Sequence, residues 1–276
     1  MARSVEILRT GEESVIGTAL LDQIAAAAQS LDMATTISQT FRGGSDWLAL
    51  FGPGAVVRDA ARHRQIANGG KAACWDLGYL GAGKLPGVSY LRVSVDHNHP
   101  WRDFDATPSD GSRLDAFGPP HLRTDAAPGG PVIVIGMGPK SRTHLGLTDW
   151  EMTKLRELKQ RFPKHSVLYR PKPVSYGGKV INRDKHIDWP LSELGPIADT
   201  LRGASLVVCR HSNVAVDACI AGIPVECEDG AAYWLYRNRC DPSLEERIDF
   251  LRRLTWWQWR TDEQKEAWQF LNTICA

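Results

Sequence analysis

The chain has 276 residues, of which 43% are hydrophobic and 24% are charged, and its formal net charge is +1. This composition excludes a disordered, coiled-coil or collagen-like chain, and the length allows two lobes or one large domain. The near-neutral balance is also unlike that of a protein that lives on nucleic acid, although it leaves room for a local basic site for a phosphorylated ligand.

The first half predicts a parallel sheet with helices on its faces. A buried strand at 46–51 is followed by a glycine turn at 52–54, a helix at 55–68 and a strand at 71–77. Strand, turn, helix and strand in this order form a βαβ unit. A further strand is predicted at 89–95, and we expect its tip and that of strand 71–77 to lie at the same sheet edge.

A tract rich in Asp, Pro, Gly and Ser between Pro100 and Pro131 is typical of a linker, and we place the domain boundary near its end. Strands and helices alternate again after it, and two amphipathic helical segments follow residue 242. The fold class is therefore α/β, with two Rossmann-like lobes and a helical tail. The predicted segments are 1–128, 129–242 and 243–276.

Targeting signals and disulfides are not expected. No apolar run reaches 18 residues, and the N-terminus lacks the apolar core of a signal peptide. The six cysteines form no Cys-x-x-Cys pair, and most lie in apolar runs. We therefore expect reduced core thiols in a cytoplasmic protein that does not contact a membrane.

The most informative stretch runs from residue 205 to residue 224. A buried strand ends at Cys209, a polar turn follows, and Asp217 lies one turn into the next helix. Unpaired N–H groups at a helix start bind anions, and an ionised Asp accepts hydrogen bonds from a diol such as a ribose. The alternative is a helix cap with a surface salt bridge, in which Asp217 stabilises the helix dipole. The predicted phosphate turn consists of Arg210, His211, Ser212 and Asn213.

This stretch resembles the donor-binding motif of GT-B fold glycosyltransferases, which has the pattern Ser–x4–acid–Ala–x3–Gly–x–Pro. The resemblance implies that the turn holds the diphosphate of a nucleotide sugar and that Asp217, where most relatives have Glu, binds the ribose. It also implies a two-lobed fold whose C-terminal helices cross back to the first lobe. The matching residues are Ser212, Asp217, Ala218, Gly222 and Pro224.

Two further segments widen this resemblance. A glycine turn follows the first strand of the second lobe, where the family keeps a turn that faces the donor. Two cations at the end of the strand at 166–170 are similar to those that clamp the donor phosphates, although solvated cations beside prolines are the simpler alternative. The resemblance adds Gly136, Gly138, Lys140, Arg170 and Lys172 to the predicted donor site.

An inverting transfer also needs a base for the acceptor hydroxyl. Asp76 and Asp96, at the ends of two first-lobe strands, are the candidates, with His97 and His99 as rivals; Asp76 could instead hold Tyr79 or a buried amide. His97 and His99 lack a nearby third metal ligand, and GT-B enzymes usually use cations and a helix end in place of a metal. We therefore expect no metal and no cofactor besides the nucleotide-sugar co-substrate.

The expected function is a metal-independent glycosyltransferase, with a UDP-sugar as the favoured donor. The first-lobe segments look like the acceptor side of bacteriophage glycosyltransferases, which makes hydroxymethylated pyrimidine in DNA a candidate acceptor. The stretch 58–64, with Arg58, Arg62, His63 and Arg64, is a candidate DNA contact. The alternatives are a glycan or small-molecule acceptor, a nucleotide-sugar epimerase and a non-catalytic nucleotide-binding relative; the oligomeric state is open.

Overall fold

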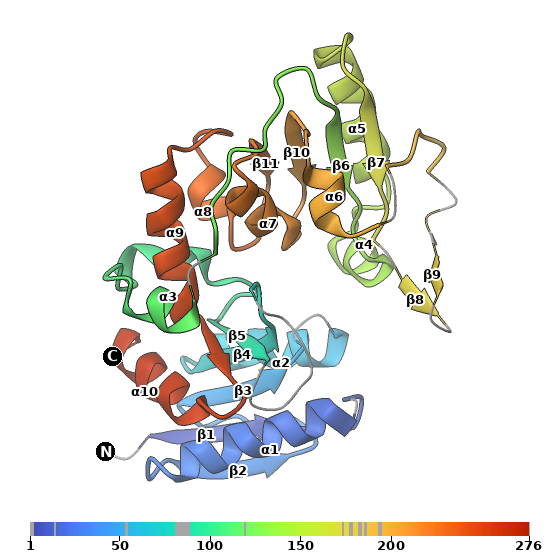
Figure 1. The fold of residues 1–276 in the computed structure, drawn as a ribbon. Coiled ribbons are helices and arrows are strands. Elements are labelled where there is room, and N and C mark those ends of the chain that lie inside the picture. Colours follow the sequence, from blue (N-terminus) through green and yellow to red (C-terminus); the bar gives the residue numbers. More distant parts are fainter. Residues whose placement is uncertain are drawn as a thin grey trace. The chain divides into compact units, whose positions relative to one another are not determined.

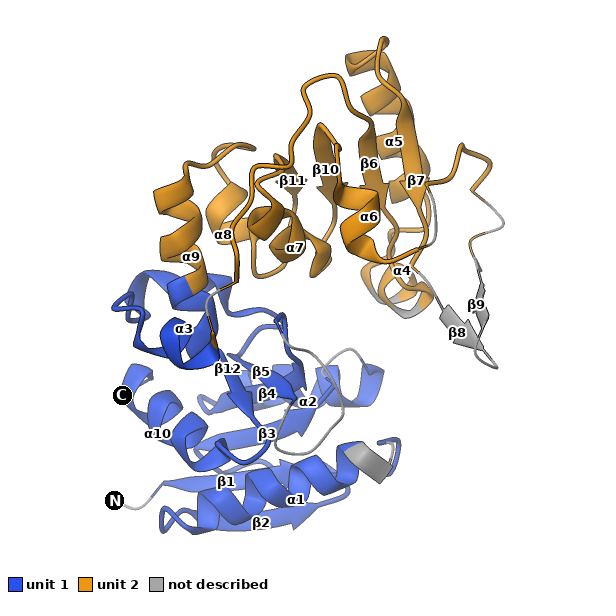
Figure 2. Cartoon of the chain, in the orientation of Figure 1, with its two compact units in different colours: residues 1–117, 252–276 blue, residues 118–251 orange. Residues whose placement is uncertain are grey.

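The computed structural model describes residues 3–275 except 14, 53–54, 81–88, 119, 173, 177–178, 182–183, 185–186 and 193–194. By their contacts the residues form two compact units, coloured separately in Figure 2. Unit 1 comprises residues 1–117 and 252–276, and unit 2 comprises residues 118–251. Each unit has its own α/β sheet (Figure 1). No helix in the described ranges is long and apolar enough to cross a membrane.

Unit 1 contains a six-stranded sheet in the order β12-β5-β4-β3-β1-β2. Strands β1 to β4 are parallel, β5 is antiparallel to β4, and β12 is antiparallel to β5. The central strand β3 has an unbroken apolar sequence, as expected for a strand covered on both faces. The strands are β1 (Ser4–Leu8), β2 (Ala34–Ser38), β3 (Trp47–Phe51), β4 (Lys71–Leu77), β5 (Tyr90–Val95) and β12 (Gln258–Arg260).

Helices cover both faces of this sheet. Helices α1 (Val15–Gln29) and α10 (Gln264–Ile274) contact each other on one face. There the Trp268 ring lies 5.7 Å from that of Trp47 and 5.0 Å from that of Trp75. Helix α2 (Val56–Ala67) covers the other face. The shorter helices are η1 (Pro100–Arg102), η2 (Phe104–Ala106) and α3 (Ser112–Phe117).

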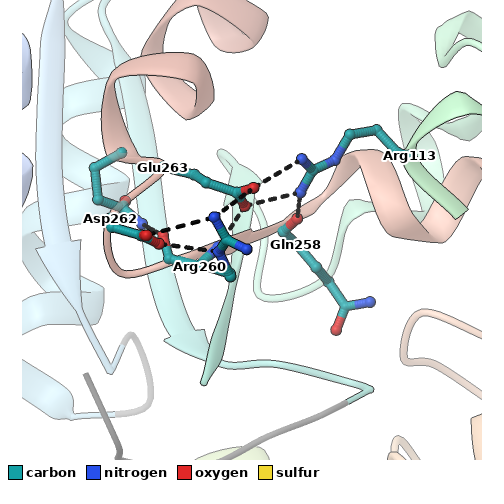
Figure 3. A network of polar contacts seen from close by, with 6 residues as sticks. Arg113, Gln258, Arg260, Asp262 and Glu263 are labelled. Carbon is teal, nitrogen blue, oxygen red and sulfur yellow. Dashed lines mark hydrogen bonds and ion pairs between the residues drawn. The ribbon is translucent and has the colours of Figure 1, made fainter. Parts of the chain in front are cut away.

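The C-terminal segment belongs to unit 1 from Arg252 onward. It begins within helix α9 (Leu244–Trp256) and supplies β12 and α10. Figure 3 shows how a polar network ties it to α3: Arg113 donates to the Gln258 carbonyl at 2.7 Å and to the Glu263 carboxylate at 3.2 Å. The same guanidinium lies 4.1 Å from the ring centroid of Trp259. The tail is therefore part of the core and sheet of unit 1.

Unit 2 contains a parallel sheet in the order β11-β10-β6-β7, built from β6 (Val132–Ile135), β7 (Val167–Arg170), β10 (Leu206–Cys209) and β11 (Val225–Cys227). Helix α5 (Trp150–Arg161) packs on one face. Helices α6 (Ile197–Leu201) and α7 (Val214–Ala221) contact each other on the other face. The remaining elements are α4 (Pro139–Leu145), α8 (Tyr233–Tyr236) and the antiparallel pair β8 (Val174–Tyr176) and β9 (Lys179–Ile181).

The predicted βαβ unit is confirmed, because β3, α2 and β4 follow one another and the two strands are parallel. The expectation of a shared edge for the tips of β4 and β5 is wrong. These strands are antiparallel, with Asp76 opposite Arg92 and Ala73 opposite Val95. Their carboxyl ends therefore lie at opposite edges of the sheet. Pro53 and Gly54 of the predicted glycine turn lie outside the described residues.

Candidate functional site

The strand order of unit 2 places a topological switch point at the carboxyl edge of its sheet. The first strand, β6, has the second strand, β7, on one side and the third strand, β10, on the other. Open parallel sheets bind ligands outside the carboxyl ends of their strands at such a switch point. Ile135 pairs in register with Cys209, so the loops after β6 and β10 leave the sheet at the same level. The glycine turn and the phosphate turn predicted from the sequence are therefore neighbours.

The turn between β10 and α7 satisfies most of its own amides. The Val214 N–H donates to Ser212 Oγ at 3.2 Å, and the Ala215 N–H donates to the Ser212 carbonyl at 3.1 Å. The Val216 N–H donates to the Asn213 carbonyl at 2.8 Å, while the exposed Asn213 side chain makes no capping bond. The helix start is consequently not the row of unpaired donors that the sequence predicts.

Asp217, in the first turn of α7, is mostly buried, and its carboxylate has no hydrogen bond or ion pair within the described part of the chain. Burial alone raises the pKa of its carboxyl group from 3.8 to about 6. At 1.36 kcal/mol per pKa unit, this rise corresponds to about 3 kcal/mol against the charged form. Interaction with a helix dipole contributes about 0.3–1 kcal/mol at an exposed site and up to about 2 kcal/mol at a partly buried one. The dipole of α7 therefore offsets part of this cost.

Arg210 and His211 connect the turn to the loop after β11. The Arg210 Nε lies 3.3 Å from Glu228 Oε2, and the Arg210 carbonyl accepts the Asp229 amide at 2.8 Å. Gly230 has φ of +95° and lies against the His211 backbone, 3.1 Å from the His211 Cα to the position of a Gly230 Cβ. The Arg210 side chain thus holds two loops together.

The glycine turn after β6 lies next to the side chain of Lys172. A Cβ on Gly136 would meet the Tyr169 hydroxyl at 2.2 Å, so this position requires glycine. A Cβ on Gly138 would lie 3.5 Å from Lys172 Cδ and 3.7 Å from Lys172 Nζ, which is ordinary contact. Lys172 is exposed and makes no ion pair with the residues that the structure describes. Lys140 is the second residue of α4 beside this turn, but its side chain lies outside the described part.

Arg170, the last residue of β7, is 4% exposed. Its Nη2 donates to the Gly195 carbonyl at 2.7 Å, and its Nη1 donates to Thr200 Oγ1. Desolvation lowers the pKa of this guanidinium. Of the two predicted phosphate cations, Arg170 therefore holds the segment that leads into α6, and Lys172 is the one exposed to a ligand.

In unit 1, Asp76 belongs to a buried polar cluster. Its Oδ2 accepts a hydrogen bond from Arg92 at 2.8 Å, and its Oδ1 accepts the Leu77 amide at 2.8 Å. Arg92 also donates to the Tyr79 hydroxyl at 2.8 Å and lies 2.6 Å from His99 Nδ1. Both carboxylate oxygens of Asp76 therefore already have donors, which are Arg92 and the Leu77 amide. These contacts give Asp76 a structural role.

Asp96 and His97 lie at the sheet edge opposite Asp76, because β5 is antiparallel to β4. Asp96 has a left-handed backbone with φ of 61°, and its Oδ1 accepts the Ala72 amide at 2.7 Å. The His97 Nε2 lies 3.5 Å from Arg102 Nη1. The structure therefore does not bring the four base candidates together.

The sequence also contains an Asp-x-Asp triplet, Asp103-Phe104-Asp105, which is a possible metal-binding pattern. The expectation of a metal-independent enzyme does not take this triplet into account. Phe104 is fully buried between the two acids. Burial, with the charge of Asp96 nearby, raises the pKa of Asp103 to about 6. No group of three or more His, Cys, Asp or Glu side chains that could hold a metal ion occurs among the described residues.

The predicted basic stretch on α2 is largely neutralised within unit 1. Arg58 forms a 2.8 Å ion pair with Glu13, and these side chains are 11% and 1% exposed. The buried Arg62 pairs with Asp59 and donates to the Asp96 carbonyl at 2.7 Å. These two arginines are consequently not available as a surface patch for DNA.

Comparison with known proteins identifies a fold. No family model and no curated protein matches the chain. Among solved structures, the chain is similar to two transferases of KpsC from Thermosulfurimonas dismutans, each at 12% identity. For the β-Kdo 2,7 transferase the TM-score is 0.57, over 98% of this chain and 99% of that one. For the β-Kdo 2,4 transferase it is 0.55, over 92% and 90%. Identity this low shows a similar fold alone.

Proposed function

We propose that the chain is a glycosyltransferase whose nucleotide-sugar donor binds at the carboxyl edge of the unit 2 sheet. Asp217 carries the proposal: it is a mostly buried carboxylate, near the switch point, that has no donor among the residues that the structure describes. A ribose diol supplies two hydroxyl donors to such a group. The similarity in fold to two Kdo transferases supports the same reaction class.

The donor phosphates would lie beside Lys172 and Gly138. Gly138 has φ of −72°, which any residue adopts, so its backbone does not demand glycine. The missing side chain instead leaves space next to the Lys172 ammonium, which approaches it closely. A preorganised cation beside a leaving phosphate stabilises the charge that develops on it as the glycosidic bond breaks.

The acceptor is proposed to be a glycan or a small molecule in preference to duplex DNA. The buried ion pairs of Arg58 and Arg62 remove the basic helix that would have held a phosphate backbone. The structural neighbours are named for transfer of Kdo, so Kdo donors belong in the assay beside UDP-sugars. Each Asp76 oxygen accepts one hydrogen bond and keeps a further lone pair, so Asp76 stays a candidate base.

Thermal unfolding with a panel of nucleotides and nucleotide sugars tests the proposal. A ligand at 100 times its Kd adds about 2.7 kcal/mol to the free energy of unfolding. We expect nucleotides with one particular nucleobase to raise the melting temperature selectively, and we expect Asp217→Asn to abolish this rise. Asp199→Asn is the matched control, because Asp199 also lies in the first turn of a unit 2 helix but is exposed. No response of the wild-type protein to any nucleotide would refute the proposal.

A further inference from the structure

A buried polar network lies directly beneath the glycine turn of unit 2. The Arg142 Nε donates to Glu151 Oε1 at 2.6 Å, and its Nη1 donates to Asp184 Oδ1 at 2.7 Å. The Tyr169 hydroxyl accepts from Arg142 Nη2 at 3.1 Å and donates to Asp184 Oδ2 at 2.8 Å. All four residues are less than 9% exposed. None of them belongs to the donor site described above.

This network contacts two of the three residues of the turn. A Cβ on Gly136 would overlap the Tyr169 hydroxyl, so the glycine backbone lies directly against it. The Met137 N–H donates to Glu151 Oε1 at 3.0 Å. Gly138 is the N-cap of α4, and its carbonyl accepts the Arg142 N–H at 3.1 Å as the first backbone bond of that helix. Position 136 is therefore fixed by contact with Tyr169, and position 137 is fixed by its hydrogen bond to Glu151.

As a way to fill the core, this polar network is no more stabilising than apolar side chains of the same volume would be. In addition, an unsatisfied buried acceptor destabilises the fold. Glu151 Oε2 is such an acceptor, with no hydrogen-bond partner in the described ranges. What apolar side chains could not supply is an acceptor for the Met137 amide at one defined place.

We propose that Glu151, Arg142 and Tyr169 are positioning residues that hold the Gly136–Gly138 turn in the conformation that receives the donor phosphates. The inference rests on the proposed function. Glu151 turns the Met137 amide inward, and this leaves the Gly138 side of the turn facing Lys172. Residues that orient a binding group in this way change affinity when they are altered, although they do not touch the ligand.

Glu151→Gln and Tyr169→Phe test the proposal, with Glu6→Gln as the matched control. Glu6 of unit 1 is also buried and also accepts loop amides, from Arg42 at 2.8 Å and from Gly43 at 3.0 Å. For the nucleotide that best stabilises the wild-type protein, we expect Glu151→Gln to raise the Kd about tenfold or more, as orienting residues do. Tyr169→Phe should raise it less, and Glu6→Gln should leave it unchanged.

Hydrogen exchange separates this inference from the proposed function, because it needs no ligand. Glu151→Gln should accelerate amide exchange in the peptide that contains Met137 and not in the one that contains Gly43. Unchanged exchange at Met137, or wild-type Kd values in both unit 2 variants, would overturn the positioning role. Accelerated exchange in a protein whose wild type binds no nucleotide would instead refute the donor site. If Glu151→Gln does not fold, Tyr169→Phe supplies both measurements.

Discussion

In unit 1 the loops after β1 and β3 are bridged by the buried ion pair between Arg58 and Glu13. The corresponding sheet edge of unit 2 carries Asp217, whose carboxylate has no partner among the described residues. Both sheets place their first four strands in the order second, first, third, fourth. In unit 1, Arg58 crosses this point and donates to Glu13 at 2.8 Å, to Thr10 Oγ1 at 3.1 Å and to the Gly52 carbonyl at 2.9 Å. In the described part of unit 2, the Asp217 carboxylate has no such donor.

The two carboxylates show how differently one topology can be used. Desolvation acts to raise the pKa of Glu13, but hydrogen bonds from Thr10 and Arg58 outweigh it, and the pKa is lowered. Desolvation of Asp217 is unopposed, and the pKa is raised to about 6. Glu13 therefore stabilises its unit, while Asp217 destabilises the ligand-free form of its own. Local conflicts of this kind are expected where a site is kept for function.

The largest loss of stability is expected at the ion pair between Arg58 and Glu13 in unit 1. Glu13→Gln removes the partner of Arg58 and leaves a buried guanidinium without a counter-charge. We expect the free energy of unfolding to fall by about 3 kcal/mol, as is typical when one partner of a buried pair is lost. Urea denaturation measures this, and nucleotide affinity should not change. A loss below about 0.5 kcal/mol would show that the pair behaves as a surface salt bridge.

A smaller loss of stability is expected at the glycine turn of unit 2. Gly136→Ala places a methyl group 2.2 Å from the Tyr169 hydroxyl, so either the ring or the turn must move. Overpacking of this kind destabilises by about 1–3 kcal/mol. Tyr169→Phe in the same chain removes the nearest atom and should restore part of the loss. Chemical denaturation of both variants decides this, and an additive loss in the double variant would contradict the contact.

Asp217→Asn is expected to stabilise the free protein. The pKa of Asp217 is about 6 in the folded state against 3.8 in the unfolded chain, so the folded state binds more protons between these values. The free energy of unfolding therefore falls as pH rises from about 4 to about 6, and it stays lower above that range. At pH 7.5 the variant should gain about 1–2 kcal/mol, because the neutral amide avoids part of the desolvation.

Asp103→Asn separates stability from binding in that experiment. The pKa of Asp103 is likewise raised to about 6, but this residue lies in unit 1, next to Asp96 and Lys71. It should gain stability over the same pH range and keep the nucleotide response. Thermal unfolding between pH 4 and pH 8, with and without nucleotide, measures both effects. Equal loss of the nucleotide response in the two variants would remove Asp217 from the donor site.

The smallest change in stability is expected for Gly138→Ala. Its backbone is in an ordinary conformation, and the nearest atom to an added methyl group is Lys172 Cδ at 3.5 Å. The free energy of unfolding should therefore change by less than about 0.5 kcal/mol. Nucleotide affinity should fall about tenfold, or about 1.4 kcal/mol, because the methyl group occupies the space of the phosphates. Calorimetric titration that gives the wild-type Kd would place the phosphates elsewhere.

Apolar runs and glycine turns suffice to predict much of the fold. Strands β3 and β10 are continuous apolar segments, β4 has an apolar centre between Lys71 and Asp76, and each is followed by a turn that the sequence marks. The first strand is harder to predict, because the buried Glu6 interrupts its apolar pattern and is satisfied by distant groups, the Ser38 hydroxyl and the Arg42 and Gly43 amides. Strand β2 is mostly exposed and has no alternating pattern.

The reversed direction of β5 could have been predicted. The segment from Gly78 to Ser89 contains four glycines and a proline, which is a poor sequence for the helix that a parallel crossover requires. The partners of the site residues could not have been predicted from the sequence. Arg170 is held by Gly195 and Thr200, and Arg210 by the loop after β11, and none of these contacts leaves a local pattern. Only tertiary structure distinguishes such structural arginines from exposed Lys172.

The placement of residues 252–276 in unit 1 has a consequence for the order in which the protein is built. Unit 2 is continuous in sequence, and every residue it needs has been synthesised once Leu251 has been added. Unit 1 begins first but lacks β12 and the Trp268 ring between Trp47 and Trp75 until α10 has been made. During synthesis the N-terminal unit is therefore the later of the two to complete its core, the reverse of the usual N-to-C order of domain folding.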